Sequence, residues 1–168
     1  MQPLEPTAWP EALEDIKTFL GIPLNIHNIM AHHPELLSVW MPLRNHVVAA
    51  SSLSPRQREL LILRTAHNCE ADYEWRHHVS RGLLAGLTQM EIDRVKKAVS
   101  ASDWRADEAA LLNAADDCHR AYRISDITLL EVTRHFNPRQ QLDIAVTVGM
   151  YMTLALIIKT FDVPMEHD

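Results

Sequence analysis

The scarcity of glycine, together with a series of capped helix starts, most constrains what this chain can fold into. The 168 residues contain only four glycines, and no segment of useful length alternates between apolar and polar residues, as a half-buried strand would. The segment Ser-Pro-Arg-Gln that begins at Ser54 supplies an N-cap, a first-turn proline and a capping-box glutamine. Thr88 with Glu91 repeats the capping box, and Asn137 followed by proline opens another helix. The sequence therefore predicts an all-α fold.

We expect eight or nine helices in one domain. Gly86 and Pro164 are placed to end two of them, since glycine favours the residue after a helix and proline cannot continue one. The expected ranges are about 10–20, 25–31, 34–50, 55–69, 70–85, 89–99, 104–122, 126–135 and 138–160. No linker or internal repeat divides the chain, so we expect a single domain over residues 1–168. The proline-rich residues 1–24 are expected to form an arm on the surface or on a neighbouring subunit.

Composition excludes several classes of protein. The net charge is -6 and the basic residues are scattered, which argues against nucleic acid as a partner. Two cysteines, Cys69 and Cys118, cannot form a disulfide framework and fit a reducing cytoplasm. The N-terminus does not resemble a signal peptide. The most apolar stretch, residues 142–158, contains Asp143 and is shorter than a membrane span needs, so we expect a helix buried in the core or between subunits and no membrane.

Three acid/base groups stand out on two consecutive predicted helices. Glu59 precedes the apolar run Leu-Leu-Ile-Leu, where a carboxylate is costly unless a partner satisfies it. Glu74 and His78 are four residues apart, so on a helix they share a face. Burial would raise the pKa of the Glu59 carboxyl, which would let it donate a proton near neutral pH. We expect these three residues to be catalytic, with His78 as proton carrier and Glu74 orienting it.

Neighbouring side chains complete the predicted site. Arg64 or Arg76 is placed to bind a substrate carboxylate in the bidentate manner of arginine, and Tyr73 and His77 are supporting candidates. Two structural interpretations remain open. Glu59 could pair with Arg64 as a buried structural acid, and the Glu74 and His78 side chains could form an ordinary surface pair.

A metal site is a further alternative in the same segment. His67, Glu70, Glu74, His77 and His78 offer nitrogen and oxygen ligands, and three of them step by four residues. No His-Glu-x-x-His pattern occurs, and Asn68 lies where a break between two helices is expected. We therefore expect no metal in this protein.

Residues 53–92 resemble the carboxymuconolactone decarboxylase and alkylhydroperoxidase D-like (AhpD-like) family. The resemblance rests on Leu-Ser-Pro-Arg-Gln-Arg-Glu-Leu-Leu-Ile-Leu-Arg-Thr-Ala from Leu53, on Tyr-Glu-Trp-Arg-His-His from Tyr73, and on Gly-Leu-Thr from Gly86. It implies an all-helical bundle that assembles as a homotrimer or homohexamer, with sites near the subunit interfaces.

The peroxidase branch of that family carries an acid followed by Cys-x-x-Cys and a histidine. Its pattern places the acid at Glu59 and the histidine at His78, but its two cysteines fall on Ala71 and Glu74. Cys69 is neither of them, so this chain lacks both cysteines that the thiol–disulfide cycle of that branch needs. The decarboxylase branch needs no thiol, metal or organic cofactor.

The resemblance therefore implies a cofactor-free acid/base enzyme, a lyase acting on a small carboxylated lactone or carbonyl compound through Glu59, Glu74 and His78. Two alternatives remain. The first is a thiol-dependent antioxidant protein of the AhpD-like, peroxiredoxin-active kind, which would need a reactive Cys69 or Cys118. The second is a non-catalytic oligomer that binds a small ligand in the same pocket.

Overall fold

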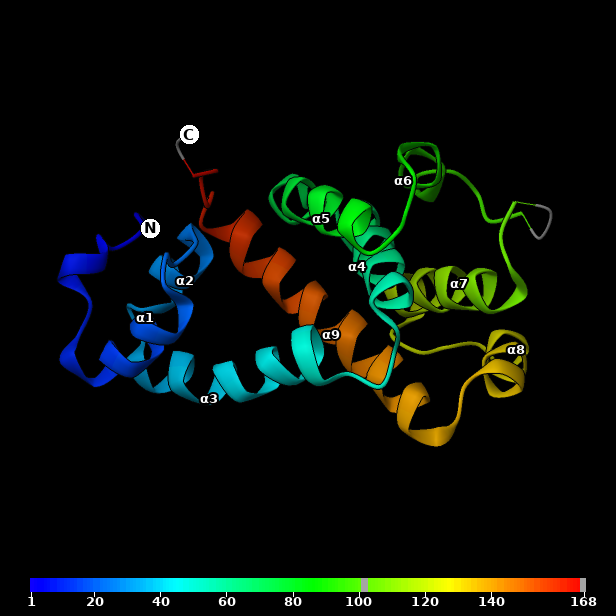
Figure 1. The fold of residues 1–168 in the computed structure, drawn as a ribbon, viewed down its shortest axis with the longest axis horizontal. Helices are drawn as coiled ribbons and strands as arrows, with labels where there is room; N and C mark the ends of the chain where they lie inside the picture. Colours follow the sequence, from blue (N-terminus) through cyan, green and yellow to red (C-terminus); the bar gives the residue numbers. More distant parts are fainter. Residues whose placement is uncertain (101–102, 167–168) are drawn as a thin grey trace. The chain divides into compact units, whose positions relative to one another are not determined.

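The computed structural model describes residues 1–100 and 103–166, and every regular element within them is helical. No strand occurs in these residues, so the predicted all-α fold is confirmed (Figure 1). The α-helices are α1 Glu14–Leu20, α2 Asn25–Met30, α3 Pro34–Asn45, α4 Pro55–Asn68, α5 Asp72–Leu84, α6 Gln89–Val95, α7 Ala106–Ala121, α8 Asp126–His135 and α9 Pro138–Thr160. Short 3-10 turns span Pro6–Ala8 and Glu11–Leu13, and a π-helical turn spans His46–Ala50.

The helix boundaries follow the capping chemistry closely where caps are present. Ser54, Thr88 and Ser125 each accept a hydrogen bond from a backbone N–H in the first turn of α4, α6 and α8. The ranges predicted for α8 and α9 match the structure. The helix predicted over 34–50 instead ends at Asn45 and continues as the π-helical turn, and α6 ends at Val95 rather than at 99.

The chain separates into two compact units, and we describe each by itself. The first comprises Met1–Ala50 and Leu156–Asp168. Within it, the predicted N-terminal arm is folded: Leu13 is fully buried and Trp9 donates its indole N–H to Asn28 Oδ1 at 3.0 Å. The backbone N–H of Asn25 donates to Glu166 at 2.7 Å. The single domain expected over the whole chain stays a prediction.

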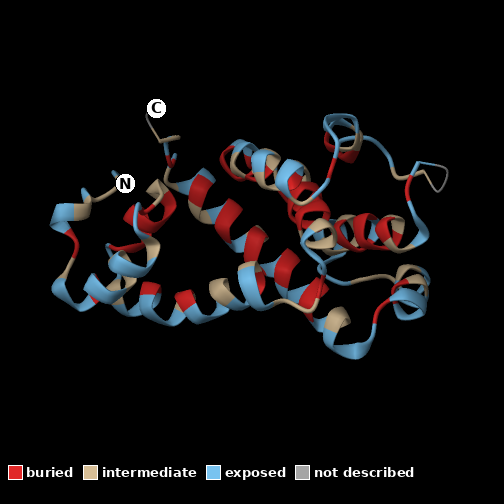
Figure 2. Cartoon of the chain, in the orientation of Figure 1, coloured by how far each residue is buried: buried red, intermediate tan, exposed pale blue. Residues whose placement is uncertain are grey.

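The second unit, Ser51–Ala155, contains α4 to α8 and most of α9. Helix α4 packs against α5, α6 and α7, and its middle is buried (Figure 2). Leu61 joins one apolar cluster with Leu111 and Ile144, whereas Leu60 and Leu63 join a second cluster with residues of α6 and α7. The continuous apolar run that follows Glu59 in the sequence is thus explained by packing on several sides of one helix.

The connection from α4 to α5 is short and fixes how the two helices meet. After α4, Glu70 adopts a left-handed backbone conformation with φ 53°, and the N–H of Ala71 bonds to Ala66 O at 2.9 Å. This is the Schellman arrangement, usually completed by glycine. Further along α5, a Cβ on Gly82 would lie 3.3 Å from the Leu63 side chain and 3.1 Å from that of Leu87, so glycine permits the close contact there.

Helix α9 is longer than its apolar stretch indicated. It runs for 23 residues, and by length and composition alone it could cross a membrane, which corrects the expectation that the stretch is too short. Half of its most apolar 18-residue window is buried inside the protein. A core helix passes the same test, so this one helix among the described residues is weak evidence for a membrane span.

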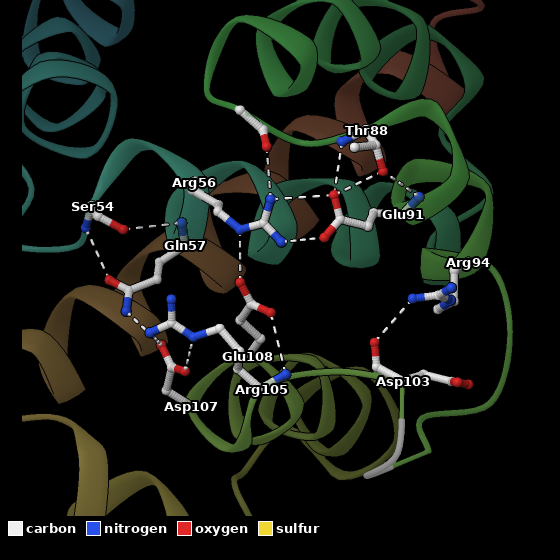
Figure 3. A network of polar contacts seen from close by, with 11 residues as sticks. Ser54, Arg56, Gln57, Thr88, Glu91, Arg94, Asp103, Arg105, Asp107 and Glu108 are labelled. Atoms are coloured by element: carbon white, nitrogen blue, oxygen red, sulfur yellow. Dashed lines mark hydrogen bonds and ion pairs between the residues drawn. The ribbon is translucent and has the colours of Figure 1, made fainter.

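A polar network joins the starts of three helices in the second unit (Figure 3). Arg56, near the start of α4, donates to Glu91 of α6 at 2.5 Å, to Glu108 of α7 at 2.7 Å and to the carbonyl of Gly86 at 2.8 Å. The hydrogen bond from Arg56 lowers the pKa of the Glu91 carboxyl from 4.5 to about 2. Glu108 is buried, so Arg56 balances a charge that water cannot reach.

Replacing Arg56 should therefore destabilise the fold. We expect Arg56→Met to lower the free energy of unfolding by about 2 kcal/mol, because it leaves the buried Glu108 carboxylate without its cation. Urea denaturation would measure the change. Arg105→Met is the matched control: Arg105 pairs with Asp107 on the surface, where an ion pair contributes about 0.5 kcal/mol or less. Equal losses in the two variants would contradict this account of the network.

Candidate functional site

The structure brings Glu59 of α4 and His78 of α5 into direct contact. Glu59 Oε2 lies 2.6 Å from His78 Nδ1, and both residues are buried. The other carboxylate oxygen, Oε1, faces Arg58 Nε at 3.5 Å. A carboxylate so placed fixes the orientation of the imidazole ring and leaves the opposite ring nitrogen, Nε2, to exchange protons.

Three side chains converge on His78 Nε2. The Tyr151 hydroxyl of α9 and Arg81 Nη1 of α5 each lie 3.1 Å away, and Glu74 Oε2 lies 3.6 Å away. The Tyr151 and His78 rings meet edge to face, with centroids 5.1 Å apart. Because a phenol and a guanidinium both donate toward Nε2, this pattern assigns the ring proton to Nδ1, which donates to Glu59.

Burial lowers the pKa of His78 below its ordinary value of 6.5. The hydrogen bond and negative charge of Glu59 raise it, whereas electrostatic interactions with Arg81 and His77 lower it further, so burial and these interactions prevail. His78 is therefore a neutral imidazole at neutral pH, with an available lone pair on Nε2. That form is a proton acceptor.

The remaining predicted site residues of α5 lie on different sides of the helix. Tyr73 is buried and its ring contacts that of His77 at a centroid distance of 4.6 Å. His77 is half-buried and Arg76 is exposed. Glu74 lies one turn before His78 on the same helix, so its carboxylate is placed next to the imidazole.

Arg64 lies in a different environment from the one predicted. Its guanidinium forms a bidentate pair with Asp116 of α7 at 2.6 and 2.7 Å and also donates to the carbonyls of Val95 and Lys97. Of the alternatives for Glu59, a pair with Arg64 is wrong, because Asp116 binds Arg64. The arginine beside Glu59 is Arg58, so a pair of Glu59 with an arginine does occur. Arg64 instead ties α4 to α7 and to the end of α6.

The residues considered for a metal also separate. No group of three or more possible ligands occurs among residues 1–100 and 103–166. Glu70 lies in the left-handed turn before α5, so the step of four from Glu70 to Glu74 does not continue along one helix. His67 and Glu70 line a separate hollow of about 390 Å³ together with Ala66, Asn68, Asp72, Trp75, Lys96 and His119.

Sequence reasoning missed Tyr151, Arg81 and Arg58. Arg81 follows His78 by three residues, so helical spacing alone could have placed it on the same face. Arg58 is adjacent to Glu59 in the sequence. Tyr151 falls within the apolar stretch 142–158, which the sequence predicts to be a buried helix, and it lies 73 residues from His78, so no local pattern connects the two.

Several solved structures share this helical arrangement, and they differ in the function that their names give. An uncharacterised peroxidase-related protein from Silicibacter sp. TM1040 is 17% identical with a TM-score of 0.80, over 95% of this chain and 87% of that one. A putative antioxidant defence protein AhpD from Agrobacterium tumefaciens is 20% identical with a TM-score of 0.75, over 84% and 97%. The debrominase Bmp8, solved as a cysteine-to-alanine variant with 2,3,4-tribromopyrrole, is 15% identical with a TM-score of 0.81, over 98% and 90%.

Likeness at this level of identity shows the AhpD-like all-α fold, in which at least one enzyme, the debrominase, is known. A comparison with curated proteins gives no match. The model of the carboxymuconolactone decarboxylase family matches residues 34–117, half of the chain. The chain belongs to this family, which confirms the resemblance drawn from its sequence. The matched range includes Glu59, Glu74 and His78 but not Tyr151.

The contact between Glu59 and His78 predicts a measurable titration shift. Since Glu59 raises the pKa of His78, we expect Glu59→Gln to lower that pKa further below 6.5. Nitrogen-detected NMR of the imidazole during an acid titration would measure it. Glu131→Gln, an acid that pairs with Arg134 on α8, is the control and should leave the His78 titration unchanged. A His78 pKa that rises in Glu59→Gln would contradict the assigned interaction.

Proposed function

We propose that this protein is a cofactor-free acid/base enzyme that acts on a small carboxylated lactone or carbonyl compound. The contact of 2.6 Å between Glu59 and His78 carries the proposal. It orients a buried neutral imidazole so that its unprotonated nitrogen, Nε2, faces Tyr151, Arg81 and Glu74. Glu59, Glu74 and His78 have the catalytic roles in this proposal.

The surroundings of His78 suit reactions that create negative charge on a substrate. Removing a proton or CO2 next to a carbonyl leaves an electron pair that must be delocalised and later protonated. Arg81 supplies a positive charge beside His78 Nε2, and a buried site strengthens such an interaction because water does not screen it. Three candidates for substrate binding remain: Arg76, which is exposed, and Tyr73 and His77, whose rings contact each other. Arg64 is no longer a candidate, because its guanidinium binds Asp116 and two backbone carbonyls.

The first test is the loss of 4-carboxymuconolactone, followed by its ultraviolet absorbance. We expect turnover by the wild-type protein and a loss of about 100-fold or more in kcat/KM for Glu59→Gln and for His78→Ala, because each removes part of the proton-transfer unit. His135→Ala, an exposed histidine at the end of α8, is the control and should keep full activity. Circular dichroism would show that all four proteins are folded.

The thiol-dependent alternative predicts that turnover needs a reactive cysteine rather than Glu59 and His78. Cys69 Sγ lies 3.8 Å from His119 Nδ1, which is the observation in favour of a reactive thiol. Cys118 is half-buried, and burial raises the pKa of its thiol, which disfavours the reactive thiolate. A Cys69→Ser, Cys118→Ser double variant that loses turnover together with peroxide reduction would support the thiol alternative over the acid/base one.

Saturable binding of the lactone without product would instead favour the second alternative, a non-catalytic binding protein.

We also propose that the chain associates with copies of itself. Helix α9 exposes Leu142 and Val146, which are one turn apart, and α8 exposes Ile127 with 82% of its surface accessible. Apolar side chains exposed next to one another are typical of surfaces that pack against a partner. Multi-angle light scattering at micromolar concentration should give a trimer or a larger assembly, and a monomer would exclude the proposal.

A further inference from the structure

Tyr151 lies outside the range of the family match and contacts His78 on the side opposite Glu59. Its hydroxyl lies 3.1 Å from His78 Nε2, and its ring packs edge to face against the imidazole at an angle of 88°. Tyr151 and His78 are both buried, with 3% and 1% of their surfaces exposed. The order of contacts is therefore carboxylate, imidazole, phenol: Glu59, His78, Tyr151.

From this geometry we infer that Tyr151 is the catalytic residue that exchanges the proton with the substrate, and that the substrates are carbonyl compounds or lactones that react through an enolate. The inference rests on the proposed acid/base function and names the group and the substrate class for it. His78 and Glu59 keep their proposed roles behind the phenol: His78 Nε2 takes the proton of Tyr151 and returns it, and Glu59 holds the imidazole in place.

The position of Arg81 supports this order. Nε2 of His78 has one lone pair, yet the Tyr151 hydroxyl and Arg81 Nη1 lie at the same distance from it, 3.1 Å. One lone pair cannot satisfy both donors fully. When the phenol gives its proton to Nε2, the Tyr151 oxygen becomes negative beside the nitrogen that Arg81 Nη1 also approaches, and the positive charge of the guanidinium stabilises it. Burial lowers the pKa of His78 and so keeps its imidazole unprotonated, whereas the hydrogen bond and charge of Glu59 raise that pKa and favour uptake of the proton.

The steps balance without an added reagent. The O–H bond of Tyr151 breaks as an N–H bond forms at His78 Nε2. The phenolate oxygen then takes a proton from the carbon next to the substrate carbonyl, and the electron pair of that C–H bond moves onto the carbonyl oxygen as an enolate. Return of the proton from Tyr151 to the far carbon of an enolate conjugated with a carbon–carbon double bond gives an isomer. His78 Nε2 then returns its proton to the phenolate, so the phenol and the imidazole end as they began. When the enolate arises by loss of CO2, the same phenol protonates the carbon, and one proton from solvent restores it.

Hydrogen–deuterium exchange separates this inference from the decarboxylase activity itself. The probe is α-angelica lactone, an unsaturated lactone that has acidic C–H bonds next to its carbonyl but no carboxyl group to lose. In D2O, proton NMR should show wild-type protein accelerating deuterium uptake and isomerisation of this lactone over a protein-free sample. Tyr151→Phe should reduce both that acceleration and any loss of 4-carboxymuconolactone by about 100-fold.

Two controls show that the loss is chemical. Tyr151→Phe removes one oxygen and keeps the ring, so the packing against His78 should survive, and imidazole NMR should still show the proton of His78 on Nδ1. Tyr122→Phe changes a tyrosine with 86% of its surface exposed and should leave the rate unchanged.

The outcomes distinguish the inference from the function on which it rests. If Glu59→Gln and His78→Ala lose activity but Tyr151→Phe retains it, the role of Tyr151 is overturned and the acid/base function stands. If wild-type protein consumes 4-carboxymuconolactone but does not exchange α-angelica lactone, the enolate substrate class is overturned alone. If wild-type protein acts on neither compound, both proposals fail.

Discussion

The contact between a buried carboxylate and a buried imidazole is the interaction on which the rest of this site depends. Glu59 lies among leucines that serve two apolar clusters, and no charge is stable there without a partner. His78 at 2.6 Å and Arg58 at 3.5 Å provide that partner from two sides. The same contact holds the imidazole with Nε2 toward α9. One pair of side chains therefore both satisfies a buried charge and orients the nitrogen that exchanges protons.

The polar groups of the second unit divide into two kinds. Arg56 and Arg64 each join several helices through buried or half-buried acids and backbone carbonyls, and their donors are occupied by structural partners. Around His78 the donors instead converge on one nitrogen atom. Hydrogen bonds spread over several helices, like those of Arg56 and Arg64, hold the helices together. Hydrogen-bond donors that converge on one atom, as around His78 Nε2, can stabilise charge that develops there during a reaction.

The sequence predicted the helices and the local half of the site. Capping boxes at Ser54 and Thr88 place helix starts, and the spacing of Glu74 and His78 places them on one face. It failed where contact depends on distant packing. Tyr151 reaches His78 only because α9 packs near α5. Which arginine of α4 or α5 lies at the site depends on helix rotation, which spacing from Glu59 does not determine. Burial of Arg64 against Asp116 is likewise a property of the packed α4 and α7 pair.

The left-handed residue between α4 and α5 has a consequence for how this protein could be made more stable. Glu70 holds a backbone conformation that costs a side-chain-bearing residue about 1 kcal/mol, and glycine there would relieve it. Glycine would also let the turn sample other geometries, and the turn sets the register of Glu59 against His78. The chain thus exchanges some stability for a fixed alignment of its two acid/base helices, the kind of trade-off that consensus stabilisation of enzymes often exposes.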